Sequence, residues 1–194
     1  MADAATTPDP AIRALSGEEA ARRVEELADV LIDCVEGGAS VSFMAPIARG
    51  TAVGFWRGVV AGVAAGDRVL LAAEDAGGIV GTVQLVFAGP ENQPHRADIA
   101  KMLVHRRGRR RGLGARLMRA AEDAARAVGR TVLVLDTATG GDAERLYPRL
   151  GWRRVGVIPN YALMPDGAPC DTTVFYRELP AVTSAADAPG RPPR

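Results

Sequence analysis

The chain has 194 residues, which is enough for one domain with a substantial core. Its 24 basic and 23 acidic residues give a formal net charge of +1, so the overall charge indicates neither a nucleic-acid-binding nor a membrane-surface protein. Two cysteines and two histidines form neither a disulfide framework nor a metal-ligand set. Without a secretory signal or a long apolar run, we expect a cytoplasmic protein that binds no membrane.

The N-terminal half is expected to contain two helices and an antiparallel hairpin. Ser16 and Glu19 have the spacing of a capping box, so a helix is predicted from Ser16 to a stop at Gly37-Gly38. The connection 39–49 is apolar for a surface loop, so it either closes over a ligand or packs on the sheet. The other predicted elements are a helix at 51–65 and strands at 68–74 and 79–88.

The C-terminal half alternates strands with helices. The predicted elements are strands at 97–104, 131–136, 152–158 and 172–179 and helices at 113–128 and 142–150. Because a helix connects 97–104 to 131–136, right-handed crossover geometry places these two strands parallel. We expect one domain over residues 12–179, a flexible N-terminus at 1–11 and a disordered tail at 180–194, which is rich in proline and alanine.

The most informative stretch is the Arg-Gly turn HRRGRRRGLG at residues 105–114, between a strand and a helix. A helix N-terminus leaves backbone N–H groups unpaired and carries partial positive charge, and glycine lets an anion approach the backbone. A Walker loop is excluded because no Lys-Ser or Lys-Thr pair follows the glycines. A Gly-x-Gly-x-x-Gly fingerprint is excluded because Leu117 stands where its last glycine is needed. The turn is therefore another kind of pyrophosphate loop, or a basic surface turn that binds nothing or nucleic acid.

Two motifs in this order resemble those of a known enzyme family. Arg109-x-x-Gly112-x-Gly114 after a strand resembles motif A of the GCN5-related N-acetyltransferases, the GNAT family, whose loop amides hold the pyrophosphate of acetyl-CoA. Ala143-x3-Tyr147-x3-Gly151-Trp152 resembles motif B of the same family. The resemblance covers residues 12–179 and implies a short first strand at 12–15. The stretches 92–104, 135–152 and 158–176 look particularly like the tabtoxin-resistance acetyltransferase branch.

This resemblance implies a fold and a cofactor site. The fold is the mixed α/β (α+β) GNAT fold, with six to seven strands, four helices, and the two parallel strands splaying apart after Met102-Leu103-Val104. Gly140 stands where many members carry asparagine, and it offers no side chain for a cofactor contact. The residues implied to bind acetyl-CoA are Met102, Leu103, Val104, Arg109, Arg110, Arg111, Gly112, Leu113, Gly114, Ala115, Asp142 and Ala143.

The resemblance also implies catalytic residues. Tyr147 matches the tyrosine that acts as general acid or hydrogen-bond donor to the sulfur, and a phenol with a pKa of about 10 suits that task; otherwise it is a core aromatic. Asp136 ends an apolar strand where the cleft opens, so it is either the base or a cap for the next loop. Asp98 is the rival base, at the position of the glutamate in histone acetyltransferases of the family. His95 is a weaker candidate.

We therefore expect an acetyl-CoA-dependent N-acetyltransferase acting on a primary amine of a small molecule, such as an antibiotic or an amino-acid-like toxin. The alternatives are a protein or peptide N-acetyltransferase, a non-catalytic acyl-CoA-binding protein and a nucleic-acid binder. Tyr147 argues against the non-catalytic reading, and the lack of a basic or aromatic surface beyond the Arg-Gly turn argues against nucleic acid. We expect no metal, and the sequence is compatible with a homodimer.

Overall fold

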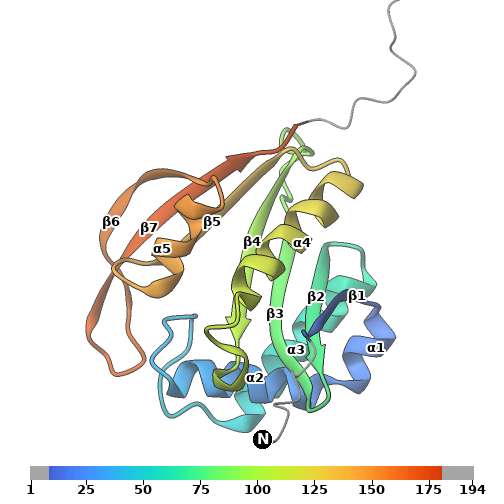
Figure 1. Cartoon of the computed structure of the whole chain (residues 1–194), viewed down its shortest axis with the longest axis vertical. Helices are drawn as coiled ribbons and strands as arrows, with labels where there is room; N and C mark the ends of the chain where they lie inside the picture. Colours follow the sequence, from blue (N-terminus) through green and yellow to red (C-terminus); the bar gives the residue numbers. More distant parts are fainter. Residues whose placement is uncertain (1–8, 181–194) are drawn as a thin grey trace, which may run out of the picture.

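The computed structural model describes residues 9–180, which form a seven-stranded sheet with helices packed on both faces (Figure 1). The sheet order is β1-β2-β3-β4-β5-β7-β6, and only the β4–β5 pair is parallel within the described residues. The elements are β1 (Ala11–Leu15), α1 (Gly17–Arg22), α2 (Val24–Glu36), α3 (Arg49–Ala64), β2 (Arg68–Asp75), β3 (Gly78–Phe87), β4 (Arg96–Val104), the 3₁₀ helix η1 (Arg106–Gly108), α4 (Leu113–Ala127), β5 (Val132–Ala138), α5 (Asp142–Arg149), β6 (Arg153–Leu163) and β7 (Pro169–Glu178). The predicted mixed fold and its parallel pair are confirmed.

The predicted termini fall mostly outside this description. The tail 181–194 and residues 1–8 lie outside the described residues. Within the segment predicted to be flexible, Arg116 donates to the Pro10 carbonyl at 2.7 Å, and Ala11 already begins β1.

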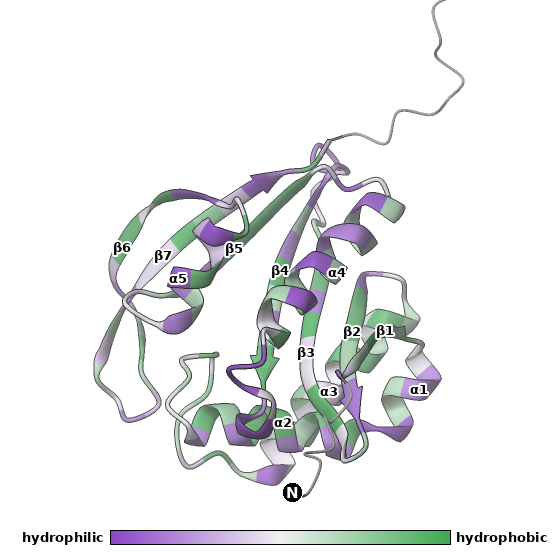
Figure 2. Cartoon of the chain, viewed as in Figure 1, coloured by the Kyte–Doolittle hydropathy of each residue, from purple (hydrophilic) through white to green (hydrophobic). Residues whose placement is uncertain are grey.

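Two cores form because successive strand residues face opposite sides of the sheet. Leu70 and Ala72 of β2 pack with α2 and α3, whereas Leu71 and Ala73 pack with α4. Figure 2 shows hydrophobic residues along β3 and β5 and hydrophilic residues recurring on α4. The four predicted helices are present in the described chain as α2, α3, α4 and α5. The described chain also contains the shorter helix α1.

The predicted helix from Ser16 is broken in two. The capping box is confirmed, since Glu19 N–H donates to Ser16 Oγ at 3.2 Å and Ser16 N–H donates to the Glu19 carboxylate at 2.9 Å. At Arg23, however, φ is −114° and ψ is 16°, which interrupts the helix between α1 and α2. The Arg23 guanidinium pairs there with Glu26 and Glu74, a residue of β2. The helical spacing of apolar residues could not predict this pairing, because Glu74 is far from Arg23 in the sequence.

The sheet opens between β4 and β5. Their register includes only Arg96–Val132, Ala97–Leu133 and Asp98–Val134. Beyond these pairs β4 stays joined to β3 up to Val104, and β5 stays joined to β7 up to Ala138. Figure 1 shows β4 and β5 meeting at one end and diverging toward the other. The predicted splaying is present, but it begins after Asp98 instead of after Met102-Leu103-Val104.

The β6–β7 hairpin is longer than the sequence predicts. β6 was expected to end at Ile158 but continues to Leu163, and β7 already starts at Pro169. An irregularity between Ile158 and Ala162 lets the strand continue, with Asn160 at φ 51° and its N–H donating to the Asp171 carboxylate at 2.8 Å. The turn-rich composition that suggested a loop thus builds a bulged hairpin.

Candidate active site

A large cavity occupies the gap between the separated strands. Its volume is about 1290 Å³, above the range of roughly 300–1,000 Å³ typical of small-molecule sites. Its walls come from residues within 37–44, 99–104, 108–115, 135–149 and 161–164, together with Cys34 and Thr172. The apolar loop 39–49 therefore contributes to the cavity wall through residues 39–44.

One end of the cavity is formed by the start of α4. The amides of residues 112–115 precede Arg116, whose N–H donates to the Gly112 carbonyl at 3.2 Å as the helix begins. Gly112 caps the helix in the left-handed region, at φ 71°, with nothing within 4 Å of the position that a Cβ would take. Open space in front of a helix N-terminus suits an anionic group such as a pyrophosphate.

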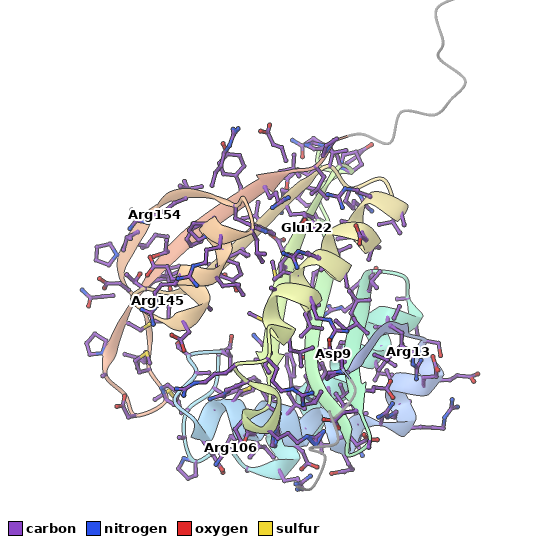
Figure 3. The ribbon with its side chains drawn as sticks, viewed as in Figure 1. Asp9, Arg13, Arg106, Glu122, Arg145 and Arg154 are labelled. Carbon is purple, nitrogen blue, oxygen red and sulfur yellow. The ribbon has the colours of Figure 1, made fainter. Side chains whose placement is uncertain are left out.

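The arginines of the turn differ in their surroundings. Arg109 and Arg110 line the cavity, whereas Arg111 is not among its wall residues. Arg109 Nε donates to the Val104 carbonyl at 3.0 Å, and its guanidinium lies 4.0 Å from the Asp33 carboxylate. Arg106, labelled in Figure 3, also pairs with Asp33, which is buried at the end of α2. Asp33 thus anchors the turn to α2.

The cavity brings Tyr147 and Asp136 together. Tyr147, on α5, is only 4% exposed, and its ring lies 5.5 Å from Phe175 and 6.1 Å from Trp152 between centroids. Burial, aided by the negative charge of Asp136, raises the pKa of Tyr147 well above its usual range. The phenol therefore stays protonated and can donate. Asp136, on β5, is exposed and lines the same cavity.

Asp98 and His95 lie elsewhere. Asp98 belongs to the last residue pair between β4 and β5, and its carboxylate pairs with Arg96. The His95 carbonyl accepts a hydrogen bond from Thr131 N–H at 2.8 Å. Neither residue lines the cavity. Asp98, Arg111 and the weaker candidate His95 are thus the three predicted residues that the cavity wall does not include. The wall does include Met102, Leu103, Val104, Leu113, Gly114, Ala115, Asp142 and Ala143.

Glu144 is a supporting residue that sequence reasoning missed. Its carboxylate accepts hydrogen bonds from Thr173 Oγ1, at 2.7 Å, and from the Gly140 amide, and these bonds lower its pKa. Arg145, labelled in Figure 3, pairs with Asp142 and donates to the Gly140 carbonyl at 2.9 Å. These contacts fix the turn from β5 into α5. The sequence offered no signal for them, because Thr173 belongs to a distant strand.

Lys101 was missed as well, although a signal was present. It is the single charged residue in the otherwise apolar stretch Ile99–Val104. Burying a charge without a partner costs free energy, so a charged residue in such a stretch indicates a functional role. Its Nζ donates to Ser42 Oγ at 3.0 Å and lies 5.6 Å from the centroid of the Phe55 ring. Burial lowers the pKa of Lys101, and the charge of Asp136 acts in the opposite direction.

In the described residues, no group of three or more His, Cys, Asp or Glu side chains is arranged to hold a metal ion. No helix among these residues is both long and apolar enough to cross a membrane.

Comparison with known proteins identifies the family. Residues 15–152 match the model of the acetyltransferase (GNAT) family. The chain belongs to the GNAT family of acetyltransferases. A protein of Azospirillum brasilense described as an uncharacterized N-acetyltransferase in the hisH-hisA intergenic region is 35% identical over 115 residues, which is 58% of this chain and 67% of that protein. The predicted acetyltransferase activity, with acetyl-CoA as cosubstrate, is thereby confirmed.

Solved structures share the fold at low sequence identity. A ribosomal-protein-alanine N-acetyltransferase from Brucella melitensis is 19% identical with a TM-score of 0.73, covering 87% of this chain and 99% of that one. A phosphinothricin acetyltransferase of the GNAT superfamily from Sinorhizobium meliloti, in complex with acetyl-CoA, is 16% identical with a TM-score of 0.71 and covers 94% of both chains. At these identities the likeness supports the GNAT architecture alone.

Proposed function

We propose that this GNAT enzyme transfers the acetyl group of acetyl-CoA to a primary amine of a small molecule. The observation that carries the proposal is the bridge over one end of the cavity. Ser40 Oγ donates to the Leu163 carbonyl at 2.9 Å, and Ala45 N–H donates to the Pro165 carbonyl at 2.9 Å. The loop after α2 is thereby tied to the tip of the β6–β7 hairpin, which favours a compact acceptor over an extended peptide.

The cosubstrate end consists of the start of α4 and one edge of β4. The pyrophosphate would bind the amides of residues 112–115, with Arg110 adding positive charge. Between Ile99 and Val104, β4 remains paired with β3 and faces the cavity with its other edge. The backbone groups on that edge are suited to bind the amides of a pantetheine chain. When bound, acetyl-CoA supplies the acetyl group as a thioester.

Tyr147 and Asp136 have the chemistry to act on the departing thiolate and on the acceptor amine. The Tyr147 phenol, kept protonated by burial, would donate a hydrogen bond to the departing thiolate, because its raised pKa disfavours the complete proton transfer for which a pKa of about 10 would be suited. The exposed Asp136 carboxylate would accept a proton from the acceptor ammonium or orient the amine. Asp98 supports this role less well, because it pairs with Arg96 outside the cavity.

The likeness to the tabtoxin-resistance branch and the phosphinothricin acetyltransferase from Sinorhizobium meliloti both agree with a small acceptor, such as an antibiotic or an amino-acid-like toxin. A cytoplasmic location fits a supply of acetyl-CoA. The ribosomal-protein-alanine N-acetyltransferase from Brucella melitensis represents the competing class, in which the acceptor is a protein N-terminus. The bridge between Ser40 and Leu163 favours the first class.

A homodimer is also proposed, through the edge strand β6. Val155 is 66% exposed and Ile158 is 44% exposed on this strand. An edge strand with exposed apolar side chains is suited to pair with another chain. Light scattering coupled to size exclusion would give the mass, and Val155→Lys should convert a dimer to a monomer. A monomeric wild-type protein would contradict this proposal.

The acceptor class is tested by measuring thiol release from acetyl-CoA with a panel of small primary amines and of short peptides with free N-termini. We expect turnover with small amines and none with the peptides. Tyr147→Phe serves as the control for background hydrolysis. Selective turnover of peptides would instead assign the enzyme to the protein-modifying class.

A further inference from the structure

We propose that Lys101 binds an anionic group of the acceptor, so that the acceptor is an amine that also carries a carboxylate or a similar oxyanion. The inference rests on the proposed function, in that an amine enters this cavity. It adds the second charged group of the acceptor and the residue that recognises it.

The backbone of β4 directs Lys101 into the cavity. Thr82 pairs with Leu103 and Gln84 pairs with Ala100, so two residues of β4 stand opposite the single residue Val83 of β3. Lys101 is one of the two, and its φ of 48° lies in the left-handed region. Thr82 Oγ1 donates to the Lys101 carbonyl at 3.0 Å and holds this bulge in place. Bulges of this kind re-aim a side chain beside an active site.

The contacts of the Lys101 ammonium leave its charge uncompensated at close range. Its one hydrogen bond within the described chain goes to Ser42 Oγ, a neutral acceptor whose residue also has a positive φ, of 79°. The Phe55 ring supplies a further weak contact, 5.6 Å from Nζ to the centroid. Among the described residues, no carboxylate lies within 4.0 Å of Nζ. A half-buried ammonium that contacts no carboxylate directly favours binding of an anion.

The acceptor end of the cavity contains one charge of each sign. Its wall segments are 39–44, 135–139 and 161–164, together with 99–104, whose backbone edge also faces the proposed cosubstrate site. Within these segments Lys101 and Asp136 are the two charged side chains, and the others are apolar or neutral. Asp136 is the proposed partner of the amine, so Lys101 remains available for an oxyanion of the same molecule. The arrangement matches a small zwitterion such as an amino acid or an amino acid analogue.

The experiment compares L-α-amino acids with their primary amides, which replace the carboxylate by a neutral group. Binding to the enzyme saturated with coenzyme A is measured by calorimetry, and acetylation is measured by thiol release. We expect the wild type to favour at least one amino acid over its amide by about 10- to 100-fold, the size of one hydrogen bond to a charged group. In Lys101→Met, that preference should disappear while acetyl-CoA affinity stays unchanged.

Three further variants test the interpretation. Lys101→Arg should retain most of the carboxylate preference, because it keeps the charge. Arg57→Met, at an exposed position of α3 outside the cavity, changes the net charge equally and should have no effect. If Lys101→Met does not fold, Lys101→Gln provides a neutral side chain of similar length for the same comparison.

The inference is overturned if no amino acid binds, if wild type binds acids and amides equally, or if the preference survives in Lys101→Met. Thiol release with amides but not with acids would leave the proposed function standing and refute the role of Lys101. Carboxylate-selective binding that depends on Lys101, without thiol release from any amine, would do the reverse.

Discussion

The indole N–H of Trp152 donates to Glu122 Oε1 at 3.1 Å, and this bond joins the two parts of the opened sheet. Glu122 belongs to α4, whose N-terminus faces the cosubstrate end, whereas Trp152 immediately precedes β6. Both side chains are buried, and Figure 3 labels Glu122 on α4. Because the Trp152 ring also packs against Tyr147, the bond links the cosubstrate helix to the proposed proton donor.

Trp152→Phe should destabilise the protein by about 1–3 kcal/mol, because it leaves a buried carboxylate oxygen without its donor. Arg177 Nε, 3.4 Å from the other carboxylate oxygen, would still pair with Glu122. Urea unfolding measures the loss. A double-mutant cycle with Glu122→Leu tests its origin: coupled losses identify the hydrogen bond, whereas additive losses would assign them to ring packing alone.

Gly112→Asp should remove acetyl-CoA binding, because a carboxylate would occupy the space in front of the α4 amides. Gly129→Asp is a matched control. Gly129 has the same φ of 71°, also with nothing within 4 Å of its Cβ position, but it lies beyond the other end of α4 and does not line the cavity. Calorimetry with acetyl-CoA should separate the two variants. Equal affinities would refute the pyrophosphate assignment.

Tyr147→Phe should lower the turnover rate by about 10²-fold or more, the effect of removing one positioned proton donor, and leave acetyl-CoA affinity nearly unchanged. Tyr161→Phe is the control, since Tyr161 also lines the cavity but is exposed on β6. Steady-state kinetics and calorimetry give the two quantities. Wild-type turnover in Tyr147→Phe would show that Tyr147 acts only as a core aromatic residue.

Asp136→Asn should depress turnover most strongly at pH values below the pKa of the acceptor amine, where loss of the ammonium proton limits the rate. Asp98→Asn should have little effect, because Asp98 pairs with Arg96 outside the cavity. The pH profiles of kcat for the two variants decide between them. The opposite ranking would identify Asp98 as the base. Full activity in both variants would show that water accepts the proton of the ammonium.

Glu144→Gln should reduce thermal stability at neutral pH but not in acid. The hydrogen bonds of the folded state lower the pKa of Glu144 below its ordinary value of 4.5, so its stabilising contribution is present above that pH. It is lost as the pH falls through and below 4.5, because the carboxylate becomes protonated. The Tm difference from wild type should therefore shrink between about pH 7 and about pH 3. A constant difference would show that the charge of Glu144 is irrelevant.

Local signals predicted much of the fold. The capping box at Ser16, the apolar alternation of the strands and the glycine at the start of α4 act through neighbouring residues, and the elements they indicate are present. The prediction of an element's bounds fails where those bounds depend on a residue that is distant in the sequence. The helix break at Arg23 involves Glu74 on β2, and the extension of β6 to Leu163 depends on its pairing with β7.

The same distinction between local signals and long-range contacts applies to the residues of the site. The Arg-Gly turn and Tyr147 could be proposed from the sequence because each sits in a contiguous motif, and both line the cavity. Lys101 could not be assigned a role, since the bulge that aims it and its contact with Ser42 both depend on the folded sheet. The separation of the strands was placed too late in the sequence, because the extent of β4–β5 pairing is a property of two strands and not of one.

The tip of the β6–β7 hairpin lies beyond residue 152, where the match to the family model ends. It nevertheless forms part of the cavity wall through residues 161–164, whereas the start of α4 lies well inside the matched region. Under the proposed function, substitutions confined to this tip would change the choice of acceptor without altering any residue at the proposed cosubstrate end. Donor binding is therefore assigned to the part of the chain that the family model matches, and part of acceptor selection to a segment outside it.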